Sequence, residues 1–179
     1  MRTGPALMVM SLMAIAACGG DAGANGAGAR GQAAAADAAQ RATRTLAAID
    51  ACSLLTADEV RTILGQSASG QPDPAGGFDL SCDWDAEDPD GMRQGVSLEV
   101  GQLQPESALR QEFNAFKTNM TFQADVSGIG DEAFLAQYSL SGSALVIRAD
   151  SLLVFIKTTE PDRQEVLKTL GPAVLERLR

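Results

Sequence analysis

The stretch AFLAQYSLSGSALVIRADSLLVFIKT, residues 133–158, decides the fold. Its runs of apolar and β-branched residues are separated by short polar turns of the kind that join neighbouring strands. With the run just before it, the stretch predicts four strands: Phe122–Val126, Ala133–Leu140, Ala144–Ala149 and Leu152–Thr158. Ser141-Gly142-Ser143 and Asp150-Ser151 supply the turns. Connections this short predict an antiparallel meander.

Upstream of the meander, the sequence predicts a hairpin and two helices. Residues 78–85 and 96–101 alternate apolar and polar side chains, the period-two pattern of strands with one buried face. Thr56 and Glu59 form a capping box, which marks the start of a helix over residues 57–64. A second helix, over residues 105–120, places four apolar side chains at helical spacing: Leu109, Phe113, Phe116 and Met120.

After Pro161 a last helix is expected, bent or interrupted at Gly171-Pro172. Its apolar face consists of Val166, Leu167, Leu170, Val174 and Leu178. The order α, β-β, α, β-β-β-β, α predicts an α+β fold, with a mainly antiparallel sheet and helices packed on one face.

Composition excludes several classes of function. The 179 residues contain no histidine, which excludes histidine-based catalysis and imidazole metal ligands. A net charge of -9 and few aromatic residues argue against nucleic-acid binding. The common serine-nucleophile motifs Gly-x-Ser-x-Gly and Ser-x-x-Lys are also missing from the sequence. We therefore assign no catalytic residue, cofactor or metal.

The N-terminus has the layout of an export signal. Arg2 precedes an apolar run from Pro5 to Ala17 that is too short to cross a hydrocarbon core of about 30 Å. The run ends in Ile15-Ala16-Ala17-Cys18, which resembles the lipobox of bacterial lipoproteins. It predicts a signal peptide over residues 1–17 and lipidation of Cys18, with ordinary secretion or an uncleaved anchor as alternatives.

The rest of the chain divides into a spacer and one domain. Residues 18–50 are rich in Gly and Ala and contain too few large apolar side chains to fold alone. Residues 51–179 are long enough for one hydrophobic core. We expect a domain held at the extracytoplasmic side of the cell membrane or outer membrane by its lipid.

Cys52 and Cys82 are the two cysteines that remain once Cys18 is acylated. In an oxidising compartment such a pair forms a disulfide. This bridge would close a loop of about 31 residues and stabilise the domain by about 3.5–4 kcal/mol. The alternative, a redox-active pair, lacks the Cys-x-x-Cys spacing.

Residues 51–60, ACSLLTADEV, and the later Cys82-Asp83-Trp84 resemble a family of bacterial envelope lipoproteins catalogued as domain of unknown function 3558. In that family a Cys-Ser-Leu-Leu-Thr helix start pairs with a downstream Cys-x-Trp. The resemblance implies a Cys52–Cys82 disulfide with Trp84 packed nearby. The chain is also distantly similar to the extracellular sensor domain of a mycobacterial membrane kinase, which implies ligand sensing without naming a ligand.

Two motifs invite a functional interpretation. Residues 128–133 fit a loose Gly-x-Gly-x-x-Ala nucleotide loop, but Asp131 and Glu132 would repel phosphate, so we expect a turn with glycine at positive φ. The acidic run 83–90 matches the first three spacings of a calcium loop. Asp88 stands in place of the required glycine, and Gln94 in place of the bidentate glutamate. We interpret the run as a solvated loop, with a looser cation site as the alternative.

Together these features predict a non-catalytic, lipid-anchored envelope protein whose domain binds a ligand or a partner. The groove between sheet and helices, or residues 66–77, would form the site. The alternative is a structural or assembly accessory that uses its acidic surface. The expected partners are the membrane, through the lipid, and an unknown protein or small molecule, but no nucleic acid. The chain is expected to be a monomer.

Overall fold

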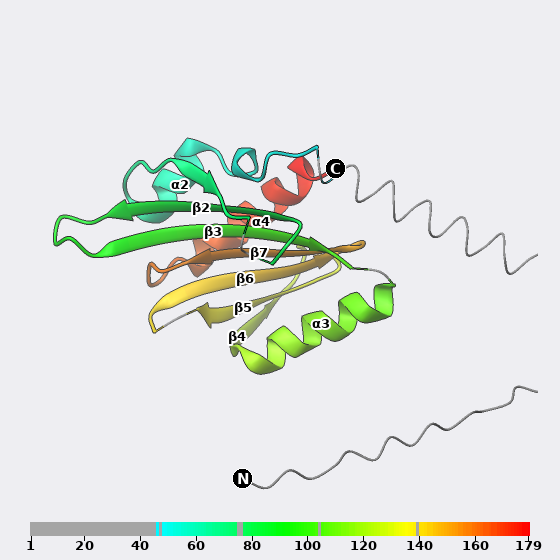
Figure 1. Ribbon diagram of the computed structural model, residues 1–179. Helices are drawn as coiled ribbons and strands as arrows, with labels where there is room; N and C mark the ends of the chain where they lie inside the picture. Colours follow the sequence, from blue (N-terminus) through cyan, green and yellow to red (C-terminus); the bar gives the residue numbers. More distant parts are fainter. Residues whose placement is uncertain (1–45, 47, 75–76, 104, 139) are drawn as a thin grey trace, which may run out of the picture. The chain divides into compact units, whose positions relative to one another are not determined.

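The computed structural model describes residues 46, 48–74, 77–103, 105–138 and 140–179 (Figure 1). The helical elements are the short 3₁₀-helix η1 (Ala51–Ser53), α2 (Ala57–Leu64), α3 (Glu106–Asn119) and α4 (Gln164–Arg177). The strands are β1 (Gly70–Pro72), β2 (Leu80–Glu87), β3 (Arg93–Gln102), β4 (Thr121–Val126), β5 (Glu132–Tyr138), β6 (Gly142–Ala149) and β7 (Leu152–Thr158). All the predicted helices and strands are present, while η1 and β1 were not predicted.

The strands form one antiparallel sheet in the order β1-β2-β3-β7-β6-β5-β4. The predicted meander β4 to β7 and the β2–β3 hairpin are confirmed, and β3 joins them by pairing with β7. Ile156 of β7 lies between Leu98 and Leu145 of the two neighbouring strands. This pairing makes β7 the central strand, and every side chain of β6 beside it is buried.

The helices cover both faces of the sheet, so the prediction that they share one face is wrong. Helices α2 and α4 pack on the face that carries Leu135. Helix α3 packs on the other face, over Phe134. Figure 1 shows α3 in front of the sheet and α4 behind it. The physical reason is that β5, β6 and β7 are apolar on both faces, and each face must be shielded from water.

Helix α4 is continuous through Pro172, which corrects the predicted bend or interruption. Its apolar side chains hold it against the sheet on both sides of the proline, while the proline itself faces solvent. Gly171 lets the helix approach closely, because a Cβ at this position would lie 3.0–3.1 Å from Ile129, Leu145 and Ile147. Packing therefore outweighs the backbone hydrogen bond that proline removes.

The packed region begins before the predicted domain start. Leu46 is buried in the same core as α2 and α4, and Ile49 packs against it. Within the part of the chain that the structure describes, no helix has the length and hydropathy that a membrane span requires. The predicted signal peptide and Cys18 lie outside the described residues, as does the spacer up to residue 45.

The predicted capping box on α2 is confirmed and also ties α2 to α4. The Thr56 amide and the Arg177 guanidinium both donate to the Glu59 carboxylate, the latter through two hydrogen bonds of 2.8 and 2.9 Å. Burial alone would raise the pKa of Glu59. The hydrogen bonds from Arg177 and Thr56 outweigh burial and hold this pKa below its usual value of 4.5.

We expect Glu59→Gln to lower stability in a pH-dependent way. Because the pKa of Glu59 is lower in the folded state, its ionised form stabilises the fold fully above the unfolded pKa, and this contribution fades as pH falls through the folded pKa. The difference in unfolding free energy between wild type and variant should therefore be constant above about pH 5 and shrink toward pH 3. Urea denaturation followed by Trp84 fluorescence measures it. A difference that stays constant down to pH 3 would contradict this assignment.

Candidate binding groove

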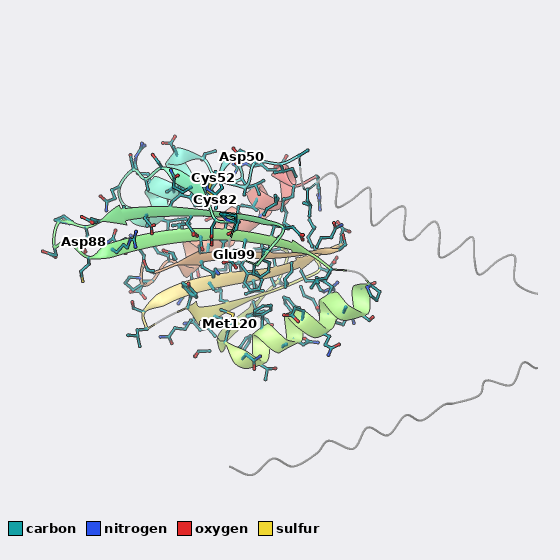
Figure 2. The ribbon with its side chains drawn as sticks, in the orientation of Figure 1. Asp50, Cys52, Cys82, Asp88, Glu99 and Met120 are labelled. Atoms are coloured by element: carbon teal, nitrogen blue, oxygen red, sulfur yellow. A yellow bond between two sulfur atoms is a disulfide. The ribbon has the colours of Figure 1, made fainter. Side chains whose placement is uncertain are left out.

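Helix α3 covers only part of its face of the sheet. Its buried side chains lie over β5, β6 and β7, which leaves the same face of β2 and β3 open. Two hollows occupy this open area and share Glu99, Tyr138 and Lys157 in their walls. We call the two together the groove. In Figure 2, Glu99 lies on the sheet and Met120 at the end of α3, and both line the larger hollow.

The larger hollow has a volume of about 570 Å³ and an aromatic floor. The ring centroid of Phe155 lies 4.6 Å from that of Phe116 and 5.2 Å from that of Phe78. Phe78 fits here because β3 has a glycine beneath it, and a Cβ on Gly101 would lie 2.8 Å from the Phe78 ring. Met120 lines the same hollow at the end of α3.

The smaller hollow, of about 290 Å³, is polar. Lys157 forms an ion pair with Glu99 where the two hollows meet, and these side chains are only 14% and 12% exposed. The Lys157 ammonium also lies 5.3 Å from the centre of the Tyr138 ring. Beyond the pair, the wall consists mainly of acidic and small polar residues: Asp73, Asp83, Asp85, Gly95, Ser97 and Thr159.

The disulfide between Cys52 and Cys82 is confirmed, and it lies on the opposite face of the sheet from the groove. Its Cα atoms are 5.2 Å apart, and Cys82 is fully buried. Trp84 packs nearby, as the family resemblance implied. A Cβ on Gly70 of β1 would lie 2.7 Å from Trp84 Nε1 and 2.9 Å from Cys82 Sγ. The bridge therefore joins Cys52 of η1 to Cys82 of β2, next to the edge strand β1.

The acidic run 83–90 divides between the groove and a turn. Asp83 and Asp85 belong to β2 and line the smaller hollow. Asp88 instead shapes the β2–β3 turn, because its Oδ1 accepts hydrogen bonds from the amides of Asp90 and Met92. Among the residues that the structure describes, no group of three or more Cys, Asp or Glu side chains lies close enough to hold a metal ion. The described residues of the run 83–90 therefore provide no set of ligands for the looser cation site.

The Gly-x-Gly motif is a turn, as predicted. Gly128 and Gly130 both have positive φ, at 81° and 60°. The two acids that follow bind a buried arginine of β6: Arg148 lies 3.3 Å from Asp131 and 2.9 Å from Glu132. The motif therefore fixes the loop before β5 against β6 rather than holding a phosphate.

Sequence reasoning missed the ion pair at the centre of the groove. The alternation along β7 places Lys157 on the same face as Phe155, and this could have been read from the sequence. Glu99 could not be assigned to this ion pair from the sequence, because the pairing of β3 with β7 joins segments far apart in the chain. Part of residues 66–77, the other predicted binding segment, forms the edge strand β1.

Comparison with known proteins gives one family. Neither the curated proteins nor the solved structures contain a match. A family model described as a protein of unknown function, DUF3558, matches residues 13–150, which run from the end of the N-terminal apolar run through β6. The chain therefore belongs to the DUF3558 family, as its Cys-Ser-Leu-Leu-Thr and Cys-x-Trp motifs suggested.

Proposed function

We propose that this protein is a lipid-anchored component of the cell envelope that binds a ligand in the groove beside α3, without catalysing a reaction. The observation that carries the proposal is the groove itself. Its two hollows fall within or near the range of about 300–1,000 Å³ that is usual for ligand sites. The larger hollow also has the apolar walls with a few placed polar groups that are typical of such sites.

The anchor rests on the sequence. Cys18 follows an apolar run that ends in small residues, and the Cys52–Cys82 disulfide fits an oxidising compartment outside the cytoplasm. Labelling cells with radioactive palmitate tests the anchor directly. We expect label on the wild-type chain and none on Cys18→Ser, whereas equal labelling of both would refute the anchor.

Binding without catalysis fits the chemistry of the groove. The one lysine in its walls is ion-paired with Glu99, whereas a lysine nucleophile acts as a neutral amine. The hollows are also open to solvent on the sheet face rather than enclosed, so water is not excluded from them. These features favour recognition over reaction.

A thermal-stability screen against a small-molecule library tests binding. Ser97→Trp would fill the smaller hollow, and Ser107→Trp places the same side chain on an exposed position of α3 outside the groove. We expect a ligand that raises the melting temperature of wild type and Ser107→Trp but not of Ser97→Trp. If the full library gives no shift, and a fixed membrane complex is instead recovered by pull-down, an assembly role replaces this proposal.

A further inference from the structure

The charge in the groove is strongly one-sided. Four carboxylates and one ammonium line the two hollows, and the ammonium of Lys157 is already paired with Glu99. Asp85 has an exposed partner, Arg93, at 3.5 Å. The Asp83 carboxylate is half-buried, and no hydrogen bond or ion pair reaches it from the residues that the structure describes. An anionic ligand would be repelled here, and a cationic one attracted.

The aromatic rings of the groove suit a cation as well. Lys157 shows this directly, since its ammonium lies within 6 Å of the Tyr138 and Phe155 ring centres. A second positive group entering the smaller hollow would lie near both Tyr138 and Asp83, which line it. The rings carry negative charge on their faces, so they add to the attraction of the carboxylates.

One buried polar atom near the groove also has no hydrogen-bond partner within the described part of the chain. Ser81 of β2 precedes Asp83 on the same face and pairs across the sheet with Glu99. It is 7% exposed, and its Oγ has no hydrogen-bond partner among the described residues. Buried hydroxyls are normally hydrogen-bonded. Ser81 lines a further hollow together with Phe78 and Asp73, which also line the groove. Its hydroxyl group therefore lies next to the groove.

We propose that the groove binds an organic cation with an apolar arm, such as an alkyl amine or a quaternary ammonium compound. This inference rests on the proposed function and narrows it to one ligand class. The apolar arm lies in the larger hollow against Phe116 and Met120, where it removes apolar surface from water. The positive group lies in the smaller hollow near Asp83.

Calorimetric titration of the full chain with three ten-carbon amphiphiles below their micelle concentrations tests the proposal. Decyltrimethylammonium, decyl sulfate and decyl maltoside have the same arm and differ in the charge of the head. We expect the cation to bind at least about tenfold more tightly than the sulfate, because the groove contains an excess of carboxylates.

Matched variants locate the binding. Asp83→Asn should weaken cation binding by about fivefold, as is typical for the loss of one partly exposed charge. Asp58→Asn removes the same charge from an exposed position on α2 outside the groove and should change nothing. Met120→Ala should weaken cation and maltoside binding alike, because it shortens the apolar wall.

The possible outcomes separate this inference from the proposed function. Equal affinity for the sulfate, or an Asp83→Asn variant that binds like wild type, overturns the cationic class and leaves a groove ligand of another kind. If none of the three amphiphiles binds, the inference and the groove as a site for small amphiphiles both fail.

Discussion

Replacing Cys52 and Cys82 by alanine is expected to lower the free energy of unfolding by about 3.5–4 kcal/mol. The bridge joins residues 30 positions apart. Its loss raises the conformational entropy of the unfolded chain, because the loop between the two cysteines is no longer closed. Between these points lie α2 and the Gly- and Pro-rich residues up to 77, where short β1 is the only strand that the structure describes. Apart from the bridge nearby, β1 is held by its antiparallel pairing with β2. The loss of the fully buried Cys82 side chain adds to the effect.

Urea denaturation followed by Trp84 fluorescence measures this loss, since the chain has one tryptophan. Wild type treated with a thiol reductant serves as the control and should approach the stability of the double variant. The double variant itself should not respond to reductant. A loss below about 1 kcal/mol would show that the bridge adds little to a fold that is already fixed.

Phe134→Ala is expected to cost about 3–5 kcal/mol, the usual range for truncating a buried phenylalanine. Phe134 is fully buried on the α3 side of β5, where its ring centre lies 5.1 Å from that of Phe113 of α3. Removing it leaves a cavity between the helix and the sheet. The variant therefore tests whether α3 forms a second core on its own face of the sheet.

Phe122→Ala is the matched control. Phe122 lies on the edge strand β4 next to Phe134, but it is 43% exposed. We expect it to cost about 1 kcal/mol or less. Similar losses for the two variants would contradict the assignment of Phe134 to a sealed core beneath α3. Thermal or urea unfolding measures both.

Local patterns predicted most of the elements because their causes are local. Thr56 and Glu59 cap α2 within one turn, and the spacing of Leu109 and Phe113 is a property of one helix. The side of the sheet on which a helix packs depends on the whole assembly. The continuous apolar runs of β5 to β7 did indicate a sheet that is buried on both faces. A sheet with only one buried face would have alternated apolar and polar residues along these strands.

The groove was less predictable than the fold. Its position follows from where α3 ends and from the pairing of β3 with β7, and no local pattern fixes either. Two of its features were visible in the sequence: the acids at 83 and 85, and an aromatic residue beside a lysine in Phe155-Ile156-Lys157. The sequence predicts a solvated loop for the first, with a looser cation site as the alternative, whereas the fold places these two acids along an open sheet face.

The most direct test of the groove uses the two methionines in the described part of the chain. Met120 lines the groove, while Met92 is 64% exposed in the β2–β3 turn. With methionine methyl groups labelled with carbon-13, NMR spectra during titration with decyltrimethylammonium, decyl sulfate and decyl maltoside report on both positions at once. We predict that at least the cation shifts the Met120 resonance and leaves Met92 unchanged. A Met120 resonance that no amphiphile moves, or equal shifts at both methionines, would contradict the account.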